Sequence, residues 1–257
     1  RGLGDVYKRQ VDDLRDGAGA RGDGDDDKDD PLDFALWKAA KPGEPVWESP
    51  WGPGRPGWHI ECVAMALHLL GDGFDIHGGG DDLVFPHHEN ERAEALGSGR
   101  TFARYWIHNG MVQVDGEKMS KSLDNFTTLS ALLDAWDPRV LRLVVLQTHY
   151  RRTMEIGSTT LDQASAALTR LDKFADRMAA ADLPEAEADS YSVARFREAM
   201  DDDLGSPQAL AVVFDAVRDA NRALDAEDDA TAATLAAAVL ELSAALGLKL
   251  GSSAAPE

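Results

Sequence analysis

FDIHGGGDDLVFPHHENER, residues 74–92, is the stretch that decides the expected fold of this chain. A short apolar run ends in three consecutive glycines, and PHHENER then begins a new element at Pro86. A strand that ends in glycines and is followed by a new element is typical of an α/β sheet that binds ligands at the carboxyl ends of its strands. The stretch therefore predicts an α/β fold over residues 31–150.

Residues 158–250 have a different pattern, with apolar side chains at every third or fourth position. Four segments share it: LDQASAALTRLDKFADRM, VARFREAMDDD, SPQALAVVFDAVRDANRAL and DATAATLAAAVLELSAALGL. This spacing is typical of amphipathic helices, with Ser206 as the expected cap of the third helix and Pro207 in its first turn. We predict a helical bundle whose apolar stripes include Leu161, Leu168, Leu171, Phe174, Phe196, Leu210, Phe214 and Val217.

The two ends of the chain fall outside these folded regions. Residues 1–10, RGLGDVYKRQ, resemble translated adaptor sequence and are left out of the fold prediction. Residues 12–30 contain almost no apolar side chain, so buried surface would not offset the entropy lost on ordering them. We therefore expect a non-native, disordered acidic segment over 1–30, folded parts over 31–150 and 151–250, and a tail over 251–257.

Composition excludes some classes of protein. The chain has 257 residues and is 44% hydrophobic, which is enough for sizeable cores. It contains no run of 18 apolar residues and no basic segment followed by an apolar stretch, so we expect a cytoplasmic protein with no membrane partner. Cys62 is the single cysteine, so no internal disulfide forms and its thiol is free, buried or bound to metal.

The net charge of −20 by itself argues against a nucleic-acid partner, because affinity for phosphate backbones rests largely on lysine and arginine. Much of the acid lies in residues 12–33 and 181–203, however. A basic segment contains Arg139, Arg142, Arg151 and Arg152. A local basic face therefore stays open as a hypothesis.

KMSKS, residues 118–122, follows a predicted strand over 111–114. Lys118 and Lys121 lie three positions apart in a serine-containing loop, where two fixed cations can stabilise the charge that builds on a polyphosphate as pyrophosphate leaves. The structural alternative is an ordinary solvated turn, because short motifs also occur by chance.

Cys62, His87 and Glu91 form a candidate metal site. His87 and Glu91 are spaced i and i+4, so on a helix both project from one face, and Cys62 would add a thiolate. This mixed donor set favours zinc but leaves a tetrahedral site one ligand short. His88 lies about 100° around the helix and is expected to point away from the metal. The structural alternative is a buried cysteine and a histidine that packs at a helix start.

HGGGDD, residues 77–82, is a weaker signal for a nucleotide. Three glycines let the backbone approach a ligand closely, and an acidic side chain beyond them can accept hydrogen bonds from ribose hydroxyls. A glycine run is also common in ordinary loops.

These motifs together resemble the cysteinyl-tRNA synthetase family. GWHIEC (residues 57–62), FDIHGGGDDLVFPHHENE, HNGMV (residues 108–112) and KMSKS occur in the family's order and at similar spacing, and DPLDFALWK, THYRR and MDDDLGSP extend the match. The resemblance implies the C-terminal part of a class I synthetase Rossmann-type catalytic domain over 31–150, followed by an α-helical bundle of the tRNA-binding type. It implies ATP-dependent activation of L-cysteine and its transfer to tRNA(Cys), with zinc selecting the cysteine thiolate and Mg²⁺ accompanying ATP.

The resemblance also implies roles for individual residues. Cys62, His87 and Glu91 match three of the family's four zinc ligands, and Lys118 and Lys121 match its catalytic lysines. The other implied positions are Trp58 and His77 in the amino-acid pocket, and His77, Gly79, Asp82, Met111, Val112 and Lys121 around ATP and the adenylate. The fourth zinc ligand and the HIGH-like motif are expected before residue 1, and the anticodon-binding domain after residue 257. Asp124 stands where the family has the glycine of KMSKSLGNF.

Two alternative functions remain. An actinobacterial ligase of the mycothiol pathway also joins cysteine, through an adenylate, to an amino sugar, and it shares KMSKS and zinc with the synthetases. IHGGG, the complete HHENE and SLDNF favour the synthetase. The second alternative is a non-catalytic fragment or a zinc-stabilised RNA-binding module.

Overall fold

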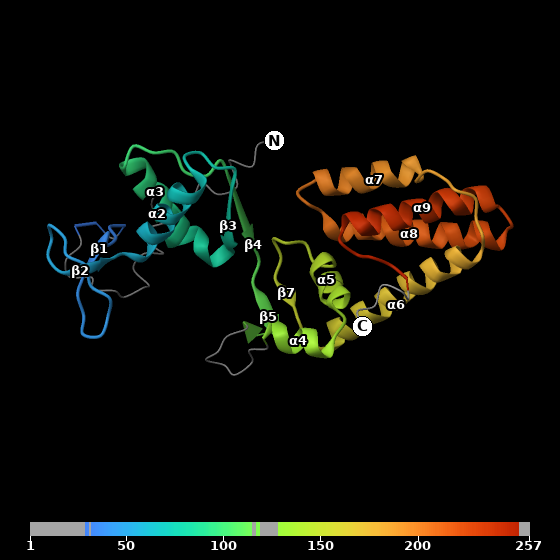
Figure 1. Cartoon of the computed structure of the whole chain (residues 1–257), viewed down its shortest axis with the longest axis horizontal. Helices are drawn as coiled ribbons and strands as arrows, with labels where there is room; N and C mark the ends of the chain where they lie inside the picture. Colours follow the sequence, from blue (N-terminus) through green and yellow to red (C-terminus); the bar gives the residue numbers. More distant parts are fainter. Residues whose placement is uncertain (1–28, 31, 115–116, 119–127, 252–257) are drawn as a thin grey trace. The chain divides into compact units, whose positions relative to one another are not determined.

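The computed structural model describes residues 29–30, 32–114, 117–118 and 128–251 (Figure 1). The chain forms two compact units that divide between Asn109 and Gly110. The domain boundary expected near residue 150 rests on the change from the α/β pattern to the helical pattern in the sequence, and it stays a prediction. The predictions for Lys121, for Asp124 and for both ends of the chain lie outside the described residues.

The first unit is built from short strands and two packed helices. Its described elements are β1 (Trp37–Ala39), β2 (Gly54–Pro56), α2 (Trp58–Leu70), β3 (Ile76–Gly80), the helical turns η3 (Asp81–Leu83) and η4 (Val84–His88), α3 (Glu89–Gly97) and β4 (Tyr105–Asn109). Strands β1 and β2 pair antiparallel, whereas β3 and β4 pair in parallel. The strand expected around IHGGG is therefore present, and its glycines belong to the strand itself.

A small apolar core holds this first unit together. It consists of Val63, Leu67, Phe74, Ala95 and Phe102, which come from α2, α3 and the segments around β3 and β4. The parallel register places His77 opposite Trp106 and Gly79 opposite His108. This pairing brings the histidines of two distant segments to neighbouring strands.

The second unit begins with a three-stranded sheet. Strand β5 (Val112–Val114) lies between β6 (Glu117–Lys118), with which it pairs antiparallel, and β7 (Met154–Glu155), with which it pairs in parallel. Helices α4 (Leu129–Ala135) and α5 (Pro138–Leu146) lie between β6 and β7 along the chain. The strand expected over residues 111–114 is thus present as β5.

An aspartate and a proline start α5. Asp137 accepts a hydrogen bond from the Arg139 backbone N–H at 2.8 Å, and Pro138 lies in the first turn, where its missing N–H costs nothing. The Arg139 guanidinium also contacts Asp172 at 2.9 Å, which links α5 to the following long helix.

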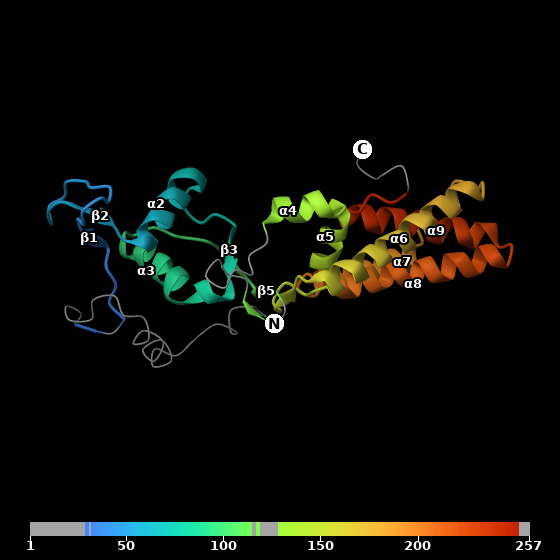
Figure 2. The same cartoon turned by 90° about the horizontal axis from the view of Figure 1, so that it is seen from below.

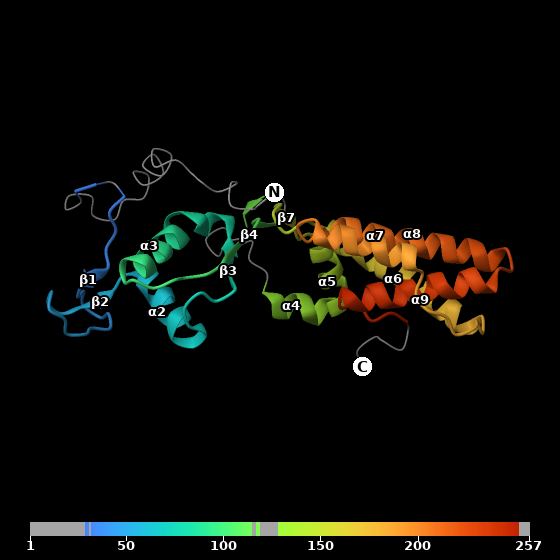
Figure 3. The same cartoon turned by 90° about the horizontal axis from the view of Figure 1, so that it is seen from above.

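The remaining helices form the predicted bundle. Helices α6 (Ser158–Ala180), α7 (Ser190–Asp201), α8 (Ser206–Asp225) and α9 (Asp229–Ala245) lie side by side in both Figure 2 and Figure 3. The predicted stripes face its interior: Leu161, Leu168, Leu171, Phe174, Phe196 and Leu210 are buried, and Phe214 and Val217 pack against them. No helix in the described part of the chain is long and apolar enough to cross a membrane.

One local prediction about a helix start is wrong. Gly205 rather than Ser206 precedes α8, and no side chain caps this helix. Pro207 does lie in the first turn. Pro86 follows the extended residue Phe85 and starts the helical stretch that continues through His88 into α3 at Glu89, as its place in a first helical turn predicts.

Candidate metal centre

Cys62, His87 and Glu91 lie together in the first unit. Cys62 projects from α2, His87 is the last residue but one of the turn η4, and Glu91 lies in the first turn of α3. Their sulfur, nitrogen and oxygen atoms all lie within 4.8 Å of one another. The His87 Nε2 atom is 3.2 Å from Glu91 Oε1, as the i, i+4 spacing predicts.

The surroundings of Glu91 fit a cation. Its side chain is completely buried, and Oε1 forms no hydrogen bond with any described residue. Burying a carboxylate oxygen without a hydrogen bond is costly, and a metal ion is one of the few groups that removes this cost. With the thiol of Cys62 and the imidazole of His87, the donor set suits zinc.

His59 holds the other side of the His87 ring. The two Nδ1 atoms are 2.8 Å apart, so one ring donates to the other and the Nε2 atom of His87 is left to face Glu91. Burial, and then the nearby His87, lowers the pKa of His59 to about 4. His59 is therefore neutral near pH 7 and acts as an orienting partner of the kind that metal-binding histidines need.

The Cys62 thiol is not activated in the metal-free chain. Burial, the negative charge of Glu91 and a hydrogen bond to Glu91 all raise the pKa of Cys62. The thiol therefore keeps its proton near neutral pH, and a metal must displace this proton to bind.

A second group of possible ligands shares the same carboxylate. His77, His88 and Glu91 also place their donor atoms within 4.8 Å of one another. The Glu91 oxygen that faces this second group is already hydrogen-bonded, because His77 Nε2 lies 2.8 Å from Glu91 Oε2, and His88 Nδ1 lies 2.7 Å from His108 Nε2. The Cys62 group is the better metal candidate because it offers a thiol and lies beside Oε1, which has no hydrogen bond with a described residue, and His88 belongs only to the second group.

Glu94 adds a further buried acid one turn along α3. Its two carboxylate oxygens are buried and form no hydrogen bond with any described residue. Burial, and then the charge of Glu91, raises the pKa of Glu94 to about 7. The sequence analysis missed this residue, although its i+3 spacing from Glu91 was visible.

The other predicted site residues of the first unit surround this cluster. The Trp58 ring is half exposed and lies 4.3 Å from the His87 ring, between centroids. Gly79 has no room for a side chain, because a Cβ would lie 2.9 Å from both His88 Cε1 and Leu83 Cδ1. Asp82 is exposed in η3.

The remaining predicted residues belong to the second unit or are not described. Met111 and Val112 lie at the start of β5, where the Met111 carbonyl accepts a hydrogen bond from Met154 N–H at 2.9 Å. The backbone of Lys118 is in β6. The structure thus groups Trp58, His77 and the metal candidates, whereas Lys121 lies outside the described residues.

Sequence reasoning also missed His59 and His108. His59 lies three residues before Cys62 on α2, so helical spacing alone would have placed both on one face. His108 contacts His88 across two segments 20 residues apart, and no local pattern reveals that contact.

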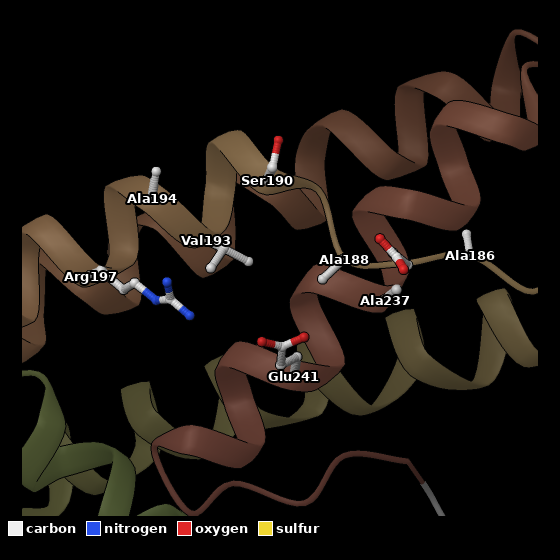
Figure 4. A pocket seen from close by; sticks show the side chains of 9 residues that line it. Ala186, Ala188, Ser190, Val193, Ala194, Arg197, Ala237 and Glu241 are labelled. Carbon is white, nitrogen blue, oxygen red and sulfur yellow. The ribbon is translucent and has the colours of Figure 1, made fainter.

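A hollow of about 550 Å³ between α7 and α9 is a different kind of site. Figure 4 shows Arg197 of α7 and Glu241 of α9 projecting into it, whereas Ser190 and Ala194 point away. Much of its wall is alanine and valine. Nothing in its lining resembles the thiol, imidazole and carboxylate group of the first unit.

Comparison with known proteins agrees with the motifs. Residues 1–166 match the family model of the catalytic domain of class I (C) tRNA synthetases, and residues 195–251 match the DALR domain. A cysteine–tRNA ligase of Thioalkalivibrio sulfidiphilus is 51% identical, over 96% of this chain and 53% of the relative. One of Stutzerimonas stutzeri is 50% identical, over 96% of this chain and 52% of the relative.

The fold is shared more widely. The LeuRS–tRNA–LeuAMS ternary complex of Agrobacterium radiobacter K84 superposes with a TM-score of 0.55 at 16% identity, covering 79% of this chain and 34% of that one. At this identity the likeness shows the fold alone. The chain spans about half the length of the cysteine–tRNA ligases that it matches. Because the catalytic-domain model covers more than half of the chain and both relatives align with nearly all of it, this chain belongs to the class I tRNA synthetases, in the family of the cysteine–tRNA ligases.

Proposed function

We propose that this chain is part of an enzyme that activates L-cysteine with ATP and transfers it to tRNA(Cys). One observation supports this proposal above the others. In a chain of this family, the donor atoms of Cys62, His87 and Glu91 lie within 4.8 Å around a buried carboxylate oxygen that forms no hydrogen bond with any described residue.

In this proposal Cys62, His87 and Glu91 hold one zinc ion. When bound, zinc supplies a soft Lewis acid that a thiolate substrate joins readily and the hydroxyl of serine joins poorly. His59 keeps the His87 ring oriented, and Trp58, half exposed beside that ring, forms a wall of the amino-acid pocket. Cysteine is thereby selected by its sulfur as well as its size.

The nucleotide half of the proposal uses the other matched residues. His77, oriented by Glu91 Oε2, contacts the adenylate, while Gly79 and Asp82 lie near the ribose and Met111 and Val112 near the adenine. These roles follow from the positions that match the family's motifs. In the proposal, ATP binds together with Mg²⁺.

The two lysines of the KMSKS motif carry the catalytic part of the proposal. Lys118 and Lys121 stabilise the charge that moves onto the departing pyrophosphate. The proposal also includes the cytoplasmic location that the sequence analysis predicts.

A hybrid protein tests this function. This chain replaces the matching half of the Thioalkalivibrio relative, and the hybrid is assayed for zinc content, cysteine-dependent ATP–pyrophosphate exchange, and transfer to tRNA(Cys) or to an amino-sugar acceptor. Cys62→Ala is compared with Met65→Ala, which removes an exposed side chain one turn along the same helix.

We expect about one zinc ion per hybrid, exchange with cysteine that far exceeds exchange with serine, and acylation of tRNA alone. Cys62→Ala should lose the zinc and most of the preference for cysteine, whereas Met65→Ala should keep both. Transfer to the amino sugar would favour the ligase alternative. A hybrid that holds zinc but shows no cysteine-dependent exchange would contradict the proposal.

A further inference from the structure

A basic cavity lies in the second unit, where two sequence motifs meet. Its volume is about 540 Å³, and its lining comes from the turn between α5 and β7 and from the start of α8. The lining residues are Gln147, Thr148, His149, Arg151, Arg152, Thr153, Pro207 and Gln208. The first motif is THYRR, residues 148–152. The second, MDDDLGSP, supplies Pro207 to the lining and Asp203, which bonds two side chains of the first motif.

Asp203 fixes the shape of this cavity. It accepts hydrogen bonds from the Tyr150 hydroxyl at 2.7 Å and from Arg151 through Nε at 2.6 Å and Nη2 at 2.9 Å. The Arg151 guanidinium, and then the Tyr150 hydroxyl, lower the pKa of Asp203, so this carboxylate stays charged at neutral pH. His149 stacks on the Tyr150 ring with centroids 5.0 Å apart. The turn is therefore ordered before any ligand arrives.

Arg152 supplies the charge that is not already used. It is exposed and lines the cavity, and no hydrogen bond or ion pair of its guanidinium is recorded within the described residues. An arginine fork matches two oxygens of a phosphate group, and such charge-assisted pairs are among the stronger hydrogen bonds. The cavity therefore presents one fixed and one available guanidinium.

The rest of the lining favours a phosphate–sugar backbone over a base. Hydroxyls of Thr148 and Thr153 and amides of Gln147 and Gln208 are hydrogen-bonding groups that suit phosphate and sugar oxygens. Pro207 is the one aliphatic side chain of the lining, and His149 is already stacked on Tyr150. A base would find little apolar surface here.

The overall charge makes such a cavity more significant. A chain of net charge −20 repels nucleic acid at long range, so its contacts with phosphates must be concentrated at local basic sites. We infer that this cavity binds a phosphodiester group of RNA. Arg152 is the main contact, and Arg151, held in place by Asp203, is a second positive charge beside it. That the RNA is a tRNA rests on the proposed function.

The test measures RNA binding by the 257-residue chain with a fluorescein-labelled tRNA(Cys) transcript, over about 50 to 200 mM salt. The variants are Arg152→Ala, Arg152→Lys and a matched control, Arg222→Ala. Arg222 is exposed on the same helix as Gln208, about 21 Å further along it, and pairs with Asp219 at 3.1 Å. Thermal unfolding of each variant checks that its fold is kept.

We expect Arg152→Ala to weaken binding about tenfold at low salt and to reduce the slope of log affinity against log salt by about 0.7 to 0.9, the loss of one phosphate contact. Arg152→Lys should keep the slope, and Arg222→Ala should match the unaltered chain. Equal affinity and slope for Arg152→Ala and Arg222→Ala would overturn the inference, and so would an unaltered chain that does not bind the transcript.

Two further assays on the hybrid separate the sources of phosphate and the two proposals. A raised KM for ATP in tRNA-free exchange by Arg152→Ala would assign the cavity to nucleotide phosphates and overturn the RNA assignment. A raised KM for tRNA in charging supports it. If the unaltered hybrid charges no tRNA with cysteine while RNA binding by the chain still depends on Arg152, the proposed function fails and the cavity assignment stands.

Discussion

The interiors of the two units differ in chemistry. In the first unit the buried residues include His59, His87, His88, Glu91 and Glu94. In the helical bundle of the second unit, by contrast, the interior consists mainly of leucine, valine and alanine. The buried polar residues of the bundle are the two serines Ser192 and Ser243, whereas those of the first unit are mainly imidazoles and carboxylates, the groups that bind metals.

The energetic roles of the two interiors differ accordingly. Each buried carboxylate of the first unit costs stability unless a hydrogen bond or a cation compensates it. In the bundle, completely buried alanines such as Ala164, Ala209 and Ala238 leave room for close helix packing, and larger residues such as Leu171 and Val213 fill the remaining space. The apolar interior of the bundle should therefore supply stability, and the polar interior of the first unit should supply metal binding.

The largest expected effect is on the stability of the bundle. Leu171 is completely buried in α6, so Leu171→Ala should lower the free energy of unfolding by about 2 to 5 kcal/mol through lost burial and a cavity. Leu240→Ala, at a half-exposed position of α9, is the matched control and should change it by about 0.5 kcal/mol or less. Urea unfolding measures both free energies. Equal losses for the two variants would contradict the proposal that the buried interior of the bundle supplies its stability.

The next effect separates binding from catalysis. In the hybrid, Lys121→Ala should slow ATP–pyrophosphate exchange about 10² to 10³-fold, or about 2.7 to 4 kcal/mol, because it removes a fixed charge that acts on the transition state. The dissociation constant for cysteine, measured by calorimetry, should stay nearly unchanged because it depends on the metal cluster. Lost cysteine affinity with normal exchange would reverse this division of roles.

The smallest expected effect is that of His88→Ala, which is compared with the same change at the adjacent His87. His87→Ala removes a metal ligand and should abolish tight zinc binding, whereas His88→Ala should weaken it by less than about tenfold, because His88 is bonded to His108. Zinc titration of both variants against a colorimetric chelator measures the difference. If His88→Ala were the more damaging change, the metal would belong to the His77–His88–Glu91 group.

The sequence by itself determined the features that depend on local spacing. The three- and four-residue periodicity predicted all four bundle helices and the side chains that they bury, because a helix repeats its faces at 3.6 residues. The i, i+4 spacing likewise predicted that His87 and Glu91 face each other. The start of α8 was missed because its backbone turn depends on neighbouring left-handed residues, Asp203 and Leu204, with φ values of 57° and 56°.

Only the tertiary structure decided which distant residues meet. Asp203 holds Arg151 across 52 positions, and His59 orients His87 across 28. Gly79 is needed because His88 from the following turn fills the space of its side chain, a reason different from the nucleotide contact that the motif suggested. Such contacts depend on the path of the whole chain, which brings segments together through burial and strand pairing, so spacing within one segment carries no information about them.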